Sequence, residues 1–423
     1  IEFVKLAQPG LGGVNLEDIA QPKCFRILDT LREECEIPVW HDDQQGTACV
    51  TLAGLINALK VVGRRIDDVE IAFIGSGAAN VAISRLIFAY GADPAKCRIV
   101  DSKGILGKDR CDIEAVKDEW VDKWKYCSMT NAEGREGGIE EALKGAHVCI
   151  ALSRQGPDTI LPEWIRGMAS DPIVFLCANP IPEMWPWDAK EAGAAIVATG
   201  RSDFPNQVNN SVGFPGIFRG TLDVRARTIT DEMCIAAAEE LAKVAEDKGL
   251  SADYIMPTMD DWEVFPREAA AVAMKAIEQG IALRTDLTFE QEVAEATAII
   301  SRARGMVQDQ MALGYIPMPE GSHAPTPTKQ AAKAAAKAAG DYAGELADRA
   351  VDAIGPTADK IAAAAQAAID KAAEALKRAS AGRKKGDGVE DAEVVAEEPP
   401  AWKPPDGDPE PPAGTGGAGT QDG

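Results

Sequence analysis

The feature that most constrains the fold is an apolar tetrapeptide followed at once by a glycine turn and a helical pattern. Residues 71–74 read IAFI, Gly75 and Gly77 follow, and from Ala78 the apolar side chains recur at helical spacing. A buried strand, a tight turn and a helix in this order are typical of a dinucleotide-binding α/β fold. In that fold the free N–H groups at the helix start hold a pyrophosphate.

A second apolar run supports this interpretation. Residues 97–101 read CRIVD and end on Asp101, 24 residues beyond Gly77, near the place where such folds put the acid that contacts the ribose. Asn80 replaces the third glycine of the usual pattern, so we expect the helix and the strand to pack slightly less closely. The predicted cofactor-binding residues in this region are Gly75, Gly77, Ala78, Ala79, Asn80 and Asp101.

Further strands, predicted over residues 147–152, 172–180 and 193–200, alternate with helical segments. This alternation predicts an α/β fold, a Rossmann-like doubly wound parallel sheet with helices on both faces. His147 begins a buried strand, which favours a structural role over that of a catalytic base. Three helices are predicted within residues 230–307. Beyond them an Ala-rich stretch predicts two helices interrupted at Gly355-Pro356, and residues 385–423 have the Pro, Gly and acid content of a disordered tail.

Composition excludes several classes of protein. The net charge of -23 argues against a nucleic-acid partner, because phosphates call for Lys and Arg patches. No apolar run approaches the roughly 18 to 20 residues of a membrane span. Nine cysteines without a CxxC spacing favour a reduced, cytoplasmic setting. The chain begins at Ile1 without Met, so we expect a fragment or a trimmed protein.

Two acidic pairs precede the glycine turn. Glu17-Asp18 and Asp42-Asp43 could converge on one hard cation, because Mg²⁺ and Mn²⁺ prefer oxygen ligands. The alternative is a pair of solvated acidic turns, which are common on protein surfaces.

The strings around these residues resemble malic enzymes, the oxidative decarboxylases of malate. The similar strings are NLEDI, HDDQQGTACVTLAGLINALK, CANPIPE and ATGRSDFPNQVNNSVGFPGIFRGTLD. The resemblance implies that Glu17, Asp18 and Asp43 bind the metal. It also implies a catalytic role for Asp42, either as a carboxylate that supports the metal ligands or as one that handles a proton. It also implies that Asn179 and Asn210 bind the substrate, with Asn179 and Asn209 near the cofactor. Gln45 stands where the family often has His, a position that is not a ligand.

The resemblance also implies a division of the chain and a reaction. Residues 1–46 would be the remnant of an N-terminal malic domain, 47–320 the NAD(P)-binding domain, 321–384 the Ala-rich helical tail and 385–423 the disordered tail. In the complete enzyme, the reaction would convert malate to pyruvate and CO₂ with reduction of NAD or NADP and a requirement for Mg²⁺ or Mn²⁺. The enzyme would be a homo-oligomer, a dimer or larger. Asp101 favours NAD narrowly, because its charge would repel a 2′-phosphate that Lys103 could in turn neutralise.

One absence leaves a second function open. In the family, the Lys base and the Tyr acid lie upstream of the NLED motif. In this chain Lys5 is the only Lys upstream of that motif, and that segment has no Tyr. The alternative is therefore a non-catalytic nucleotide- and metal-binding module with an assembly or regulatory role.

Overall fold

The computed structural model describes residues 1–317, and the chain divides into two compact units, residues 1–304 and 305–423. The predicted Ala-rich and disordered tails lie outside the described residues. The predicted division of the first unit at residue 46 stays a prediction. Among the described residues, none of the helices is both long and apolar enough to cross a membrane.

The main sheet has six strands in the order β5-β4-β3-β6-β7-β8. The bounds are β3 (Ile71–Ile74), β4 (Cys97–Asp101), β5 (Gly104–Ile105), β6 (Val148–Ala151), β7 (Ile173–Leu176) and β8 (Ile196–Thr199). Neighbouring strands are parallel except for the edge strand β5, which pairs antiparallel with β4 and was not predicted. The predicted fold class is confirmed. Because β3 lies between β4 and β6, the chain reverses its direction across the sheet there, and ligands of such sheets bind beside this point.

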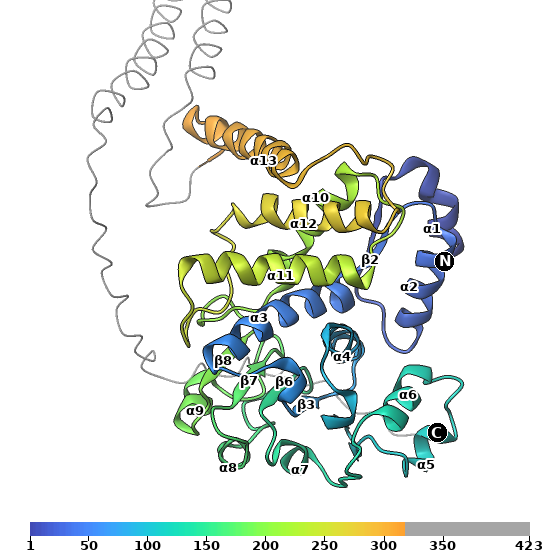
Figure 1. The fold of residues 1–423 in the computed structure, drawn as a ribbon, viewed down its shortest axis with the longest axis vertical. Helices are drawn as coiled ribbons and strands as arrows, with labels where there is room; N and C mark the ends of the chain where they lie inside the picture. The colour runs from blue at the N-terminus through green and yellow to red at the C-terminus, as the bar shows by residue number, and fades with distance from the viewer. Residues whose placement is uncertain (318–423) are drawn as a thin grey trace, which may run out of the picture. The chain divides into compact units, whose positions relative to one another are not determined.

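Helices cover both faces of the sheet. The α-helices of residues 1–317 are α1 (Glu2–Ala7), α2 (Lys23–Glu34), α3 (Thr47–Val61), α4 (Ala78–Tyr90), α5 (Cys111–Glu114), α6 (Val121–Met129), α7 (Ile139–Leu143), α8 (Pro162–Arg166), α9 (Pro186–Glu191), α10 (Phe214–Asp223), α11 (Asp231–Lys248), α12 (Val264–Glu278) and α13 (Phe289–Ala312). Figure 1 shows α3 and α11 on one side of the sheet and α7, α8 and α9 on the other.

Alternation along the strands sorts their side chains between these two layers. Ile71 and Phe73 of β3 belong to the core that includes α3, α4 and α11, while Ala72 and Ile74 belong to the core that includes α7, α8 and α9. Successive strand residues point to opposite faces, so a strand with four apolar residues is buried on both sides.

A second, two-stranded sheet lies outside the predicted pattern. Strand β1 (Val14–Leu16) pairs in parallel with β2 (Val39–His41), and Leu16 lies opposite His41. A π-helical turn, η2 (Asp42–Gly46), leads directly from β2 into α3. This small sheet brings the two acidic pairs together.

Candidate active site

The two acidic pairs directly follow two adjacent parallel strands, at the same end of the small sheet. Glu17 and Asp18 follow β1, and Asp42 and Asp43 follow β2. The backbone N–H of Asp18 donates to Asp43 Oδ2 at 2.8 Å, which ties the two segments together. The turn η2 also packs against α4 and against the short helix η5 (Asn210–Val212). The acidic segment therefore lies beside the helix that starts at the glycine turn.

Asp42 is the buried member of this group. Trp40 Nε1 donates to Asp42 Oδ1 at 3.2 Å, and Asn210 Nδ2 donates to Asp42 Oδ2 at 2.5 Å. Burial raises the pKa of Asp42 to about 6; the Trp40 hydrogen bond lowers it, and the charges of Glu17 and Asp43 raise it further. A carboxyl with this pKa can accept and release a proton near neutral pH, which suits a proton-handling role.

The proposed metal ligands match a divalent cation in chemistry. Glu17 and Asp18 are exposed and Asp43 is half-buried, so all three offer hard oxygen donors near the surface. Glu17 Oε1 accepts a hydrogen bond from Asn15 Nδ2 at 2.7 Å. Within residues 1–317, however, no three His, Cys, Asp or Glu side chains are grouped so that they could share one ion. The donor types fit a hard cation, but their positions in this structure do not complete a site.

His41 is a residue of this region that sequence reasoning did not select. Its side chain is fully buried, and neither ring nitrogen has a hydrogen-bond partner. Burial lowers its pKa, while Asp43, Glu17 and Asp18 act in the opposite direction. The sequence signal for His41 was weak: it directly follows the apolar pair Val39-Trp40 and precedes the acidic pair.

The glycine turn has the geometry predicted for it. Gly75 has φ +104, and a Cβ there would lie 2.4 Å from the carbonyl oxygen of Leu152, so only glycine fits. Gly77 is extended and precedes α4, and no side chain caps the helix start. Ala78 and Ala79 open the helix and are half-buried. These residues leave an uncapped helix N-terminus at the carboxyl end of β3.

Asn80, which stands where the usual pattern has its third glycine, links the strand to the helix. Its side chain is buried, and Nδ2 donates to the carbonyl oxygens of Ile74 at 3.0 Å and Gly75 at 2.9 Å. The amide thus fastens the end of β3 to the first turn of α4. The Nδ2 group of Asn80 is thus engaged inside the protein, whereas its Oδ1 is buried without a hydrogen-bond partner in the described part of the chain, and the cofactor role of this residue stays a prediction.

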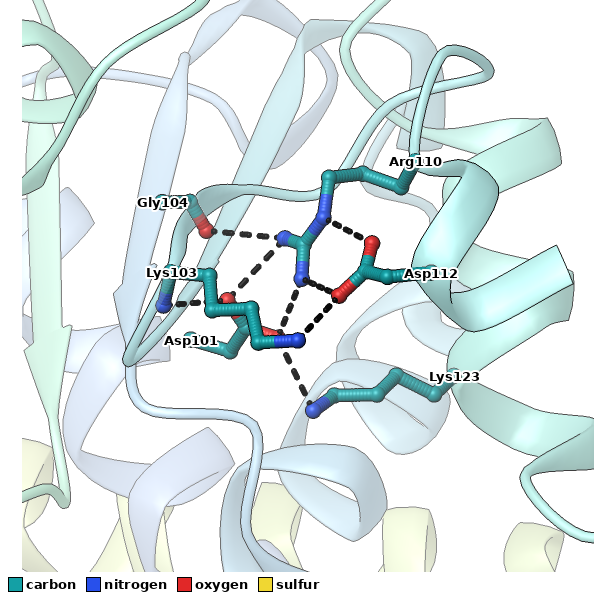
Figure 2. A network of polar contacts seen from close by, with 6 residues as sticks. All are labelled: Asp101, Lys103, Gly104, Arg110, Asp112 and Lys123. Atoms are coloured by element: carbon teal, nitrogen blue, oxygen red, sulfur yellow. Dashed lines mark hydrogen bonds and ion pairs between the residues drawn. The ribbon is translucent and has the colours of Figure 1, made fainter. Parts of the chain in front are cut away.

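Asp101 ends β4 as predicted, but its carboxylate is already engaged (Figure 2). Arg110 donates to both oxygens, at 3.0 and 2.9 Å, and Lys123 Nζ lies 2.9 Å from Oδ2. Burial opposes the charge, but the hydrogen bonds from Arg110 and Lys123 outweigh it and keep the pKa of Asp101 below its ordinary value. The ribose-binding role of Asp101 was reasoned from its place in the chain, which carried no sign of these partners.

The asparagines fall into two groups. Asn179 is exposed and follows β7, and a Cβ at Gly200 would lie 3.0 Å from Asn179 Nδ2. Asn209 Nδ2 donates to the carbonyl oxygen of Gly200 at 3.4 Å, and its Oδ1 accepts from the N–H of Ser211 at 2.9 Å. Asn179 and Asn209 thus meet around Gly200, just past β8, whereas Asn210 faces Asp42.

Glu183 is a further residue of this region to which the sequence alone assigned no role. It is fully buried, and Oε1 accepts from the N–H of Ser153 at 2.7 Å while Oε2 accepts from the N–H of Ala178 at 3.1 Å. It therefore joins the loops that follow β6 and β7, next to Asn179. An acidic residue inside an otherwise apolar motif, CANPIPE, was the signal that could have pointed to it.

Comparison with known proteins agrees with this geometry. Residues 44–279 match the family model described as malic enzyme, NAD binding domain. The chain is 48% identical over 299 residues to the bifunctional malic/malolactic enzyme of Bacillus subtilis (strain 168), covering 70% of each protein. It is 42% identical over 290 residues to the NAD-dependent malic enzyme of Geobacillus stearothermophilus, covering 68% of this chain and 58% of that protein.

Solved structures agree as well. The malic enzyme of Entamoeba histolytica superposes with a TM-score of 0.73 at 53% identity, over 75% of this chain and 65% of that one. The malic enzyme of Pyrococcus horikoshii Ot3 superposes with a TM-score of 0.69 at 49% identity, over 72% of this chain and 70% of that one. The chain thus spans 58% to 70% of the length of these four proteins. With the family model matched across more than half of the chain, including the whole six-stranded sheet, the chain belongs to the malic enzyme family.

Proposed function

We propose that the protein oxidatively decarboxylates malate to pyruvate and CO₂ and passes the hydride to NAD or NADP. The observation that carries this proposal is the hydrogen bond between Asn210 and the buried Asp42. It joins the substrate-binding motif to the acidic segment that packs beside the helix of the glycine turn. Relatives of this chain known as NAD-dependent and NADP-dependent malic enzymes support the same reaction.

The roles of the side chains follow from their surroundings. Oxidation moves a hydride from C2 of malate to the nicotinamide and a proton from the C2 hydroxyl to a base. Loss of CO₂ then leaves an enolate, which gains a proton at C3 to give pyruvate. Asp42, with its pKa near 6, can hold or relay a proton beside the substrate, and Asn210 orients this carboxyl. Asn179 and Asn209 can present amides to the substrate and the nicotinamide without adding charge.

The proposal includes a divalent cation, Mg²⁺ or Mn²⁺, held by Glu17, Asp18 and Asp43. When bound, such an ion polarises the carbonyl oxygen formed at C2 and favours decarboxylation. Because the three donors are not yet grouped in this structure, binding would draw the exposed Glu17 and Asp18 towards Asp43. We also propose that the protein is cytoplasmic and acts as a homo-oligomer. Sedimentation of the purified chain would test the oligomeric state.

The test separates this reaction from the alternative of a nucleotide- and metal-binding module. Purified protein is mixed with malate, Mn²⁺ and either NAD or NADP, and reduced cofactor and pyruvate are measured together. Equal amounts of both products are expected. Cofactor and Mn²⁺ binding by calorimetry without any product would instead favour the module.

The metal assignment has its own test. Asp43→Asn should weaken Mn²⁺ binding strongly, because it removes one of three charged oxygen ligands while keeping the shape of the side chain. Equal Mn²⁺ affinity in wild type and variant by calorimetric titration would refute the assignment of Asp43.

A further inference from the structure

One charged side chain of β4 lies on a buried face of the main sheet. Arg98 pairs with Ala72 of β3, and Ala72 belongs to the apolar core that includes α7, α8 and α9. Only 4% of the Arg98 side chain is exposed. A guanidinium stays charged in proteins, so a buried arginine calls for acceptor oxygens around its N–H groups.

The acceptors around Arg98 satisfy only part of its guanidinium. Nη2 donates to Glu70 Oε2 at 2.8 Å. Nη1 lies 3.9 Å from Glu133 Oε2, which is beyond hydrogen-bonding distance. Nε is buried and has no hydrogen-bond partner within residues 1–317. Buried donors without a partner are rare in folded proteins, and a bound ion or water is one explanation for them.

A cavity of about 160 Å³ lies beside these groups, with Arg98, Glu70, Glu133 and Lys96 in its wall. Lys96 Nζ donates to the carbonyl oxygen of Asp67 at 2.8 Å, and the further donors of an ammonium group remain for a ligand. A cavity of about 150 Å³ accommodates benzene, so this cavity suits a ligand of roughly six non-hydrogen atoms.

The charges around the cavity favour an anion. Glu133 Oε2 lies 2.6 Å from Arg135 Nε, so a second arginine already neutralises its charge. Lys96, Arg98 and Arg135 together carry three positive charges, against the two negative charges of Glu70 and Glu133. The group therefore has a net charge of +1, which one carboxylate would neutralise.

We propose that this cavity, called here the Arg98 cavity, binds a small monocarboxylate, to which Arg98 Nη1 and Lys96 Nζ donate. Charge-assisted hydrogen bonds of this kind are stronger than neutral ones. The site goes beyond the proposed function, because it lies at the opposite end of the strands from the glycine turn. Glu70 and Lys96 directly precede β3 and β4, whereas Gly75 follows β3. The four residues of β3 separate the two ends by about 13 Å.

Glu133 gives the proposal a direction. Its carboxylate is close enough to Arg98 Nη1 to repel an arriving carboxylate and to compete for the same donor. Its side chain is 59% exposed, so the fold should tolerate Glu133→Gln. Removing this charge should tighten binding at least threefold, and removing the charge of the exposed Lys96 in Lys96→Gln should weaken it at least threefold. Arg98 itself is left unchanged, because its replacement in the core could unfold the protein.

The probe is propionate, and propionamide is its uncharged counterpart of nearly the same shape. Ligand-observed NMR titration of the full chain measures the dissociation constants of both. Wild type should bind propionate at least tenfold more tightly than propionamide, and Lys96→Arg should retain this ratio. Lys125→Gln and Glu136→Gln are the matched controls, because both residues are exposed and lie outside the cavity wall, and their ratios should equal that of wild type.

Ala132 allows the location of the bound carboxylate to be tested. It is exposed and lines the cavity. Cys111 is the one exposed cysteine of the nine, all of which lie within residues 1–317, so Cys111→Ser removes the background reaction. In that protein, Ala132→Cys adds a thiol to the cavity wall. Propionate should slow the reaction of this thiol with a thiol reagent at least threefold, and propionamide should leave its rate unchanged.

Two results would overturn the proposal. Propionate that binds no more tightly than propionamide, or not at all, would leave the cavity to water. Propionate binding that is unchanged in Lys96→Gln and does not protect the thiol of Ala132→Cys would place the carboxylate elsewhere on the protein. Either result leaves the oxidation of malate untouched, because that reaction is tested by its own products.

Discussion

Gly46 offers a direct test of how the acidic segment and the Asn210 loop are held together. Its backbone is right-handed helical, with φ -64 and ψ -49, so alanine can adopt it without strain. A Cβ at this position would lie 2.1 Å from Asp42 Oδ1 and 3.1 Å from Asn210 Cβ. Gly46→Ala should therefore introduce no backbone strain, but its Cβ should clash with the Asp42 carboxylate.

The expected cost follows from the two hydrogen bonds that hold this carboxylate. Real Cβ atoms do not approach other atoms within 3.0 Å, so Asp42 Oδ1 must move by about 1 Å. That shift disrupts the bonds from Trp40 and Asn210, each worth about 1.5–3 kcal/mol for a charged acceptor. Alanine has a higher helix propensity than glycine, which raises the free energy of unfolding by about 1 kcal/mol. The free energy of unfolding should thus fall by about 2–5 kcal/mol.

Urea unfolding of the wild type and the variant measures this loss, and turnover of malate measures the functional effect. A displacement of about 1 Å at a reacting group can cost about 10²-fold in rate, so kcat/KM should fall by at least tenfold. Gly138→Ala is the control, because nothing lies within 4 Å of its added Cβ, and its stability should change by less than about 0.5 kcal/mol. A Gly46→Ala protein as stable as wild type would show that Asp42 is not confined in this way.

Two further changes test the buried carboxyls. Glu183→Gln replaces one acceptor oxygen with an NH₂ group that faces a backbone N–H, so the free energy of unfolding should fall by about 1–3 kcal/mol. If urea unfolding shows that this free energy falls by less than about 0.5 kcal/mol, Glu183 does not join the two loops in this way. Burial, and then the neighbouring Asp223, raise the pKa of Glu292 to about 8 from its ordinary 4.5. Since the folded state binds the extra proton between these values, stability should fall as pH rises from about 4.5 to about 8. Glu292→Gln should flatten this decline, and an unchanged pH profile of the melting temperature would argue against it.

The sequence alone determined the α/β class, the positions of the principal strands along the chain and the glycine turn. Apolar runs such as residues 71–74 and 97–101 are buried on both faces wherever they pair, so their strand character is readable locally. The Gly75 turn is equally local, because its positive φ favours glycine, whereas its close approach to Leu152 depends on the pairing of β3 with β6. The acidic pairs and the asparagine motifs were likewise visible as residues, although their functions were implied by resemblance to a family.

Only the tertiary structure decided how these residues meet. The pairing of β1 with β2 brings Glu17 and Asp18 to Asp42 and Asp43, and neither three-residue strand has a strong pattern of its own. Asn210 reaches Asp42 from 168 residues away, and Asp101 receives Arg110 and Lys123 from the segment after its strand. Such contacts depend on how separate elements pack, and a side chain's partners set its charge and its free acceptors. For this reason Asp101 was correctly placed by its position in the chain, while its availability to a nucleotide was a property of the folded protein.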